Sequence, residues 1–403
     1  MGSKRTSLEQ WQAMWKSGFE SVAVDIVGFC NAKCKYCPSG NDLSHAGEYM
    51  SPDFFQKIVN KLLDYSFVTK ETSFHIYGLG EPMLHPQINE ILHIIEKCGL
   101  TTNISTNASK VPTVDQAAVK AVNRILISMP GFSQKSYDKI HGFNFEQIKR
   151  NILKLKEEFV GVPFDMTYHI YQFNMNEMED ARKFCEENNI RFAPNYAVIF
   201  EKSKCMELVD GTMAYDELLE ASTDLFLNVL RQQIDDSPRN YCDYKERYLS
   251  INCRGDVRTC SAHSSKIEDN MLCGNLLRDD VNDILYRKNT HPWCNLCISK
   301  GLTCGKGYDC KVFPDFYFSL LREKEFYQDL CPAEKNGDAI KEIEVMHQIR
   351  KWEEMHYDDK EYETTQKMIQ KSEMDEESVK SIIMKYSRFK DKTYDKLYGR
   401  VKA

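Results

Sequence analysis

The sequence predicts an α/β protein with a parallel sheet, followed by a small cysteine-rich segment and a charged helical extension. Apolar, strand-like runs alternate with amphipathic stretches from about residue 20 to residue 200. Residues 240–332 are instead rich in cysteine, glycine and short turns. The last 71 residues contain 31 charged side chains of alternating sign, which indicates solvated helices packed on the body rather than a partner-binding arm.

Six strand-like runs give six strand–helix units, two fewer than a complete (β/α)8 barrel needs. The strands are expected at 22–27, 74–78, 101–105, 124–129, 164–173 and 192–200. The helices between them are expected from Ser51-Pro52 onward and at 86–98, 115–122, 145–159 and 176–188. The domains that follow are an N-terminal helix (1–20, with Trp11 and Trp15 on one face), a partial barrel (21–210), a linker helix (211–239), the cysteine-rich segment (240–332) and the extension (333–403).

Composition excludes several classes of function. The 403 residues include 42% hydrophobic and 28% charged residues, as in ordinary globular proteins, and the net charge of −7 offers no basic field for nucleic acid. We find neither an apolar run long enough to span a membrane nor a secretion signal, so we expect a cytoplasmic protein. In a reducing compartment, fifteen cysteines indicate metal binding or catalysis rather than disulfides.

Three cysteines, Cys30, Cys34 and Cys37, lie on one short loop directly after the first predicted strand. Three thiolates can hold three irons of a [4Fe–4S] cube and leave the fourth iron open to a small molecule. The alternative is a zinc site, which prefers four ligands in paired knuckles. No fourth cysteine or histidine lies close by in the sequence, so the loop favours the open cluster.

After the second strand comes Tyr77-Gly-Leu-Gly-Glu-Pro82, in which closely spaced glycines let the backbone approach a ligand and Glu81 can accept from an ammonium group. With the C-x3-C-x2-C loop, this segment resembles the radical S-adenosylmethionine (radical SAM) superfamily over residues 20–200. The resemblance implies an open partial (β/α)6 barrel and a SAM site, although Leu79 stands where the family usually has glycine. The residues implied as SAM contacts are Tyr36, Gly78, Gly80, Glu81, Ser105, Asn107, Ser128 and Asn174, with Thr106 and Gln172 as looser matches.

The resemblance also implies the chemistry. The open iron binds SAM, and an electron from a reductant such as flavodoxin or ferredoxin cleaves SAM to methionine and a 5′-deoxyadenosyl radical. That radical abstracts hydrogen from an unactivated carbon. The barrel positions the substrate and excludes water.

In the cysteine-rich segment, seven cysteines and Gly255 follow an order that closely resembles the SPASM module, which carries two auxiliary [4Fe–4S] clusters and would raise the total to three. The segment 249–260 reads as a hairpin, and Gly274 as the start of a helix. By resemblance, an outer cluster is held by Cys294, Cys297, Cys304 and Cys331. An inner cluster is held by Cys242, Cys260 and Cys310, and its fourth ligand is Cys273, Cys253 or substrate.

Auxiliary clusters imply that the substrate radical loses an electron, so the expected reaction is an oxidation. A base for the second proton could be His169, Tyr171, Tyr196 or Glu201, each of which is also compatible with a structural role. The Gly-x-Gly-Glu-Pro variant, together with Ser128-Met-Pro-Gly131 on the fourth strand, resembles relatives that act on carbohydrates or other small metabolites, and this implies such a substrate. A peptide substrate and a non-catalytic electron-transfer protein remain alternatives.

Overall fold

The computed structural model describes residues 18–39, 45–226, 242–260 and 270–302, most of 345–399, and the isolated positions 9 and 13. The predicted N-terminal helix, with Trp11 and Trp15, lies almost entirely outside these residues, as do Cys304, Cys310 and Cys331. The chain divides into two compact units, residues 1–315 and 316–403. In the described residues, no helix is long and apolar enough to cross a bilayer.

The first unit is built on one nine-stranded sheet, in the order β6-β5-β4-β3-β2-β1-β7-β8-β9. The predicted strands are confirmed as a run of parallel neighbours from β1 to β6. Their bounds are β1 Ser21–Val24, β2 Ser73–His75, β3 Thr102–Thr106, β4 Val122–Met129, β5 Phe164–Ile170 and β6 Arg191–Tyr196.

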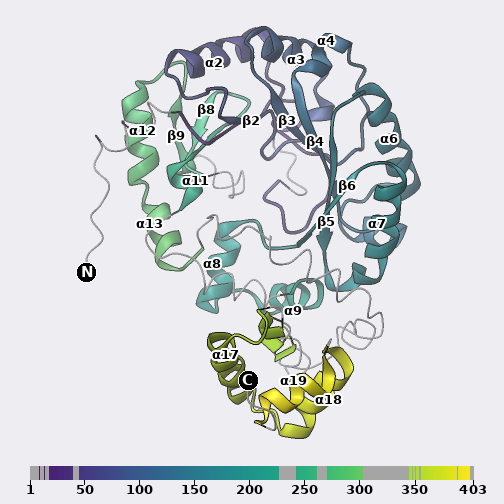
Figure 1. Ribbon diagram of the computed structural model, residues 1–403. Coiled ribbons are helices and arrows are strands. Elements are labelled where there is room, and N and C mark those ends of the chain that lie inside the picture. Colours follow the sequence, from purple (N-terminus) through teal and green to yellow (C-terminus); the bar gives the residue numbers. More distant parts are fainter. Residues whose placement is uncertain are drawn as a thin grey trace. The chain divides into compact units, whose positions relative to one another are not determined.

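Helices cover the outer side of these strands, and Figure 1 shows them as an arc around the sheet. Their bounds are α2 Pro52–Asp64, α3 Ile88–Lys97, α4 Gln116–Lys120, α5 Gln134–Lys139, α6 Phe145–Glu158 and α7 Met178–Glu187. Ser51 caps α2 by accepting from the Phe54 backbone N–H, and Pro52 fills its first turn, as predicted. The short α5 was not predicted, and it begins where the Ser133 hydroxyl accepts from the Ser136 N–H.

The hairpin of the cysteine-rich segment continues the same sheet. β7 (Tyr248–Ile251) pairs in parallel with β1 over four residues, from Ser21 opposite Tyr248 to Val24 opposite Ile251. β7 then turns back into β8 (Asp256–Arg258), which confirms the predicted hairpin. The strand that carries the three-cysteine loop therefore lies between the barrel and this hairpin.

The structure corrects the helix expected to begin at Gly274. That residue lies in strand β9 (Leu272–Asn275), because its backbone pairs with Val257 of β8. The helix α12 (Val281–Thr290) begins later, where the Asp280 carboxylate caps the N–H groups of residues 282 and 283. It is followed by α13 (Pro292–Ser299).

After β6 the chain forms α8 (Lys202–Asp210), which ends at Gly211, whose φ of 68° is left-handed. In the described part of the expected linker helix (211–239), the chain forms α9 (Tyr215–Asp224), which ends where Leu225 is extended. Residues 227–241 lie outside the described part. Likewise, β5 ends at Ile170, and the 3-10 helix η2 (Gln172–Glu177) takes the place of the expected end of that strand.

The second unit contains the predicted charged helices, α17 (Asp359–Ser372), α18 (Glu376–Tyr386) and α19 (Lys390–Leu397). Its core is formed around Trp352, which is fully buried and packs edge-on against Tyr357 with ring centroids 4.9 Å apart. The buried carboxylate of Glu353 accepts from the hydroxyls of Ser387 and Thr393.

Candidate functional site

The three-cysteine loop (residues 28–37) follows β1. Gly28 N–H donates to Glu48 O (3.0 Å), and Lys33 N–H donates to His141 O (3.3 Å). Within the loop, Cys37 N–H donates to Cys34 O at 3.3 Å, so the second and third cysteines share one turn. All three thiols are partly buried.

The three thiols lie within electrostatic reach of one another. Burial, then the charge of Glu81, raises the pKa of Cys30 to about 12. Burial, followed by the charges of Cys37 and Cys30, raises the pKa of Cys34 well above its ordinary value. Such thiols stay protonated at neutral pH unless a metal takes the place of the proton, so iron binding here releases protons.

Among the described residues, no three His, Cys, Asp or Glu side chains form a site for a single metal ion. A single ion needs its ligands at one point, whereas each thiolate of a [4Fe–4S] cube binds a different iron. Three thiols on one loop match the three protein ligands that a cube with one open iron requires.

The two glycines of the 77–82 segment are required by close contacts. A Cβ on Gly80 would lie 1.9 Å from the carbonyl oxygen of Val27, which is backbone and cannot yield. A Cβ on Gly78 would lie 2.7 Å from a carboxylate oxygen of Asp25. The next residue, Glu81, donates its N–H to Phe29 O at 2.9 Å, so the glycine segment lies directly against the start of the three-cysteine loop.

Glu81 is buried, and it connects the glycine segment, the end of β3 and the three-cysteine loop. Its carboxylate accepts from Thr106 Oγ1 (2.7 Å), Met83 N–H (3.0 Å) and Asn107 N–H (2.8 Å). Burial raises its pKa to about 7 against the effect of these hydrogen bonds. The Asn107 amide in turn donates to Cys30 Sγ at 3.7 Å. A carboxylate accepts about four hydrogen bonds, and the protein supplies three of them here.

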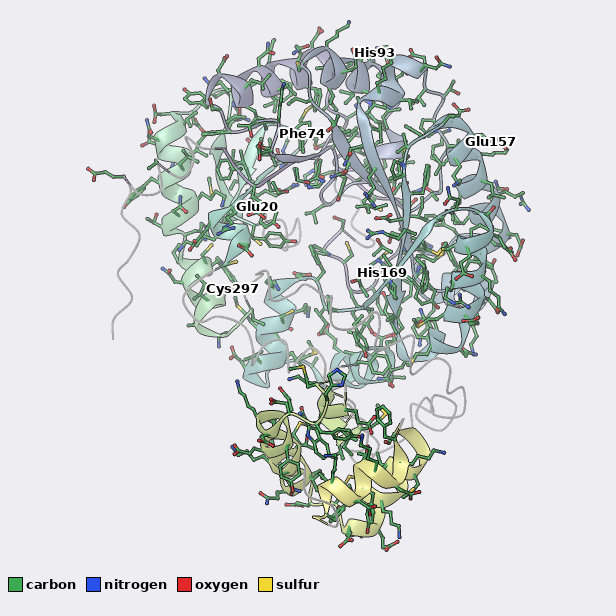
Figure 2. All side chains as sticks on the ribbon, viewed as in Figure 1. Glu20, Phe74, His93, Glu157, His169 and Cys297 are labelled. Atoms are coloured by element: carbon green, nitrogen blue, oxygen red, sulfur yellow. The ribbon has the colours of Figure 1, made fainter. Side chains whose placement is uncertain are left out.

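The polar residues predicted on later strands share one face of the sheet. Ser105 lies opposite Leu126, two residues before Ser128, and Ser128 lies opposite Thr167, two residues before His169, so all three side chains point the same way. Ser128 Oγ lies 3.2 Å from His169 Nε2. Burial lowers the pKa of His169 to about 4, so the imidazole is neutral at pH 7. Figure 2 shows His169 on the concave side of the strands.

The predicted SAM contact Asn174 is held by local contacts, and so are the remaining candidate bases, Tyr171, Tyr196 and Glu201. The Asn174 amide donates to the carbonyls of Pro130 and His169, and its oxygen accepts from Tyr171 N–H. Tyr171 is buried and stacks on Phe173, and burial raises the pKa of its hydroxyl. Tyr196 is buried edge-on against Phe226. Glu201 precedes α8 and accepts from the hydroxyl of Ser203.

Two buried acids that hold the site together were not identified from the sequence. The first is Asp224, at the end of α9, and its side chain is 1% exposed. Its carboxylate accepts from Tyr36 Oη (2.9 Å), from Lys35 Nζ (3.1 Å) and from Lys139. α9 thereby fixes two consecutive residues of the three-cysteine loop. Gln172 donates to Leu225 O at 2.7 Å and fixes the end of α9 in turn.

The second missed residue is Asp25, directly after β1. It is buried, accepts from Leu79 N–H at 2.9 Å and forms a buried ion pair with Arg258 of β8. The sequence did contain a signal for this residue, since Asp25 is the only acid in the apolar run 22–27. A charge buried in such a run needs a partner. The hairpin of the cysteine-rich segment is therefore linked through one carboxylate to the glycine segment.

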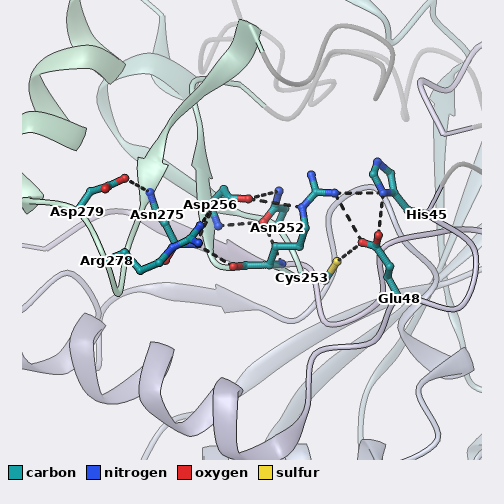
Figure 3. Close-up of polar contacts among 9 residues, drawn as sticks. His45, Glu48, Asn252, Cys253, Asp256, Asn275, Arg278 and Asp279 are labelled. Atoms are coloured by element: carbon teal, nitrogen blue, oxygen red, sulfur yellow. Dashed lines mark hydrogen bonds and ion pairs between the residues drawn. The ribbon is translucent and has the colours of Figure 1, made fainter.

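The described cysteines of the cysteine-rich segment lie on or beside different elements. Cys242 precedes the short helix α11 (Asp243–Glu246), and Cys260 follows β8. Cys297 of α13 donates to Leu302 O and packs in the apolar cluster that also contacts Cys34 and Tyr36. Figure 3 shows Cys253 in a polar network instead, where its thiol donates to Glu48 at 3.5 Å.

Comparisons with known proteins agree with this arrangement. Residues 24–185 match the family model described as "Radical SAM superfamily". The chain is 26% identical over 170 residues to "Probable GTP 3',8-cyclase" of Methanococcus vannielii, covering 41% of this chain and 55% of that protein. It is 22% identical over 163 residues to "PqqA peptide cyclase" of Bradyrhizobium diazoefficiens, covering 40% of this chain and 41% of that protein. The chain thus spans about half the length of these relatives.

Among solved structures, the chain is similar to Streptococcus suis SuiB bound to precursor peptide SuiA. The TM-score is 0.49 at 16% identity, and the match covers 71% of this chain and 70% of SuiB.

Proposed function

Because residues 24–185 form a radical SAM domain, the chain belongs to the radical SAM superfamily, and we propose that it is a SAM-cleaving enzyme that oxidises a small, carbohydrate-like metabolite. When bound, a [4Fe–4S] cluster and SAM supply a 5′-deoxyadenosyl radical, which abstracts hydrogen from an unactivated carbon. In this proposal an external reductant such as flavodoxin or ferredoxin provides the electron, and auxiliary clusters bring the total to three.

The observation that carries the proposal is the chain of contacts from Glu81 through Asn107 to Cys30. One buried carboxylate holds the end of β3 beside the first cysteine and would accept from the SAM ammonium. Cys30, Cys34 and Cys37 would hold the cluster. Tyr36 would lie beside the adenine, with its ring fixed through the hydroxyl by Asp224.

His169 is the best candidate for receiving the substrate proton. Its imidazole is neutral at pH 7, it shares the concave face with Ser105 and Ser128, and Ser128 orients it. Tyr171 is less suited, because its raised pKa keeps the hydroxyl protonated and its ring is stacked. Tyr196 and Glu201 are held by contacts near α8 and α9.

The names of the relatives bear on the substrate class. A GTP cyclase acts on a small metabolite, and this supports the proposed class, while a peptide cyclase supports the alternative of peptide modification. An electron-transfer protein without SAM turnover is the alternative from another class. The open-iron loop and the Gly-x-Gly-Glu-Pro segment argue against it, because an electron carrier needs neither.

The test is anaerobic reconstitution followed by mass spectrometry for 5′-deoxyadenosine, with sugars, nucleotides and peptides as candidate substrates. We expect reductant-dependent 5′-deoxyadenosine and product in a fixed ratio with one substrate class. His169→Ala should keep SAM cleavage and reduce product formation about 100-fold, the low end for a general base. Absence of 5′-deoxyadenosine in iron-loaded protein would favour the electron carrier.

A second test concerns the auxiliary clusters. Replacing Cys294 and Cys297 together should leave some reductive SAM cleavage and eliminate substrate oxidation. The soluble fraction of the variant is measured first, because metal binding is part of folding in this segment. Oxidation of substrate one-for-one with SAM in a soluble variant would show that the cluster held by these residues is only structural.

A further inference from the structure

A lysine lies in the interior of the cysteine-rich segment. Lys288 of α12 has no exposed surface. Its ammonium donates to Tyr244 O at 3.1 Å and to Lys245 O at 2.5 Å, the carbonyls of the helix that follows Cys242. An ammonium has three donors, so one remains beyond these two carbonyls.

Within the described part of the chain, no carboxylate forms an ion pair with this ammonium. Glu246 interacts with it only through space, and burial raises the pKa of Glu246. Desolvation of a lysine is costly enough that fully buried examples are normally paired with an anion or made neutral. The carboxylates of the described residues therefore leave the charge of Lys288 unbalanced.

Four cysteines act on the ammonium electrostatically. Cys294, Cys273, Cys242 and Cys260 all lie within electrostatic reach of Lys288. Contacts of neighbouring residues place Cys273 close to Cys260 and to Lys288. Thr259, next to Cys260, lies with its hydroxyl 3.0 Å from Cys273 Sγ, and Arg287, next to Lys288, donates to Cys273 O at 2.9 Å.

Cys273 and Cys253, the two candidates for the fourth ligand, lie in different surroundings. Cys273 is fully buried on β9, between Thr259 and the end of α12. Cys253 lies in the network of Figure 3, where its thiol contacts Glu48 and Gly28 near the three-cysteine loop. Of the two, Cys273 is the one that lies with Cys242, Cys260 and Cys294.

We propose that Cys273 is a ligand of the auxiliary iron–sulfur cluster assigned to Cys242 and Cys260, and that Lys288 is the buried counter-charge of that cluster. The inference rests on the proposed function only for the presence of iron–sulfur chemistry. Four thiolates make such a cluster anionic, and a fixed ammonium beside it favours the more negative, reduced state. Lys288 is thus a positioning residue that raises the reduction potential of an electron acceptor.

A simpler role for Lys288 is capping of α11, since lysines commonly bond the last carbonyls of a helix. That role accounts for the two hydrogen bonds but not for the four cysteines. It also requires only a donor, whereas the counter-charge role requires a positive charge. The two roles therefore predict different behaviour for Lys288→Gln, which keeps donors and loses the charge, and for Lys288→Arg, which keeps both.

The first experiment counts iron in the full chain carrying Cys30→Ala, Cys34→Ala and Cys37→Ala, so that the remaining iron is auxiliary. Adding Cys273→Ala should remove between about one and four irons per chain, because a cube loses a corner iron or falls apart when a ligand is lost. Cys253→Ala is the matched control and should leave the iron unchanged. If Cys273→Ala leaves the iron content unchanged, or if only Cys253→Ala lowers it, the ligand assignment is overturned.

The second experiment measures midpoint potentials by EPR-monitored titration in the same background. Lys288→Gln should disfavour reduction at least tenfold, which is about 59 mV for one electron, and Lys288→Arg should stay close to the parent. Loss of auxiliary iron in a folded Gln variant, with iron kept in the Arg variant, also supports the counter-charge. Unchanged iron and potential in the Gln variant would leave only the capping role.

Failure here is distinguishable from failure of the proposed function. SAM cleavage by the parent chain and the response of its EPR signal to SAM test the proposed function and depend on the three-cysteine loop. Auxiliary iron and its potential are read without SAM or substrate. If Lys288→Gln aggregates, Cys273→Ala against Cys253→Ala still decides the site.

Discussion

The three-cysteine loop and the cysteine-rich segment both contain buried thiols beside buried charges, but the charges are balanced differently. Beside the loop, Asp224 receives two lysines and a tyrosine hydroxyl, so its charge is balanced by the protein itself. In the cysteine-rich segment, Lys288 has two carbonyls, and no carboxylate in the described residues pairs with it. The protein therefore balances the buried charge at the first site by itself, whereas the described residues leave the lysine at the second site without a carboxylate partner.

The largest expected effect concerns the loop itself. Replacing Cys30, Cys34 and Cys37 with alanine should remove about four irons per chain and abolish SAM cleavage, because one cube is lost. Iron analysis and 5′-deoxyadenosine assays measure this. Cys185→Ala, which removes a fully buried thiol of α7 far from the loop, should change neither quantity. Zinc in place of iron, or unchanged iron in the triple variant, would exclude the cluster.

The next effect tests how the two regions are joined. Arg258→Met leaves the buried Asp25 without its partner and should reduce the free energy of unfolding by about 3–5 kcal/mol. It should also weaken SAM binding, since Asp25 positions Leu79. Urea denaturation and SAM titration measure the two effects.

Arg247→Met is the matched control for that prediction. Arg247 precedes β7 and pairs with Glu20, which precedes β1, and with Asp243 at 3.6 Å. Because the Arg247 and Glu20 side chains are about 40% exposed, the loss should stay within about 1 kcal/mol. Equal losses of unfolding free energy in the two variants would show that burial of the Asp25–Arg258 pair does not determine the size of the loss.

A smaller effect is expected at the SAM segment. Glu81→Ala should weaken SAM binding by about 2–3 kcal/mol, the scale of a charge-assisted hydrogen bond, with iron content nearly unchanged. Calorimetry on reconstituted protein measures the affinity. Glu177→Ala removes a comparable acid that accepts from Ser133 and Ser136 instead, and it should bind SAM normally. Parent-like affinity in Glu81→Ala would assign Glu81 a purely structural role.

The smallest effect is a pH dependence at the far edge of the sheet. Burial alone would raise the pKa of Asp165, but hydrogen bonds from Arg191 and Arg124 outweigh it and hold the pKa below its ordinary 3.8. The resulting stability is therefore present above about pH 4 and lost as the pH falls through the folded-state pKa. Asp165→Asn should lose about 1–2 kcal/mol at pH 7, and the difference from the parent should shrink below pH 4. A pH-independent difference in urea denaturation would contradict this.

The sequence predicted the barrel strands well, because apolar alternation is a local signal, and the SAM contacts assigned to the glycine segment stay a prediction. It missed β9, since Leu272–Asn275 becomes a strand only through pairing with β8. It could not place Asp224 or Lys288 either, because the partners of a buried charge are distant in sequence. Gly80 was predicted from its spacing, but the reason for it, contact with Val27 O, is visible only in three dimensions.

The parallel pairing of β1 with β7 has a consequence for how the chain folds. Glu20 and Arg247, which flank these strands, are 227 residues apart in sequence, so β1 lacks one neighbour until most of the chain has been synthesised. Non-local parallel pairing closes slowly and leaves a strand edge open to other chains in the meantime. The three-cysteine loop starts on that open edge. We therefore expect a folding intermediate in which this loop is reachable before the sheet is finished, and in which aggregation competes with the arrival of β7.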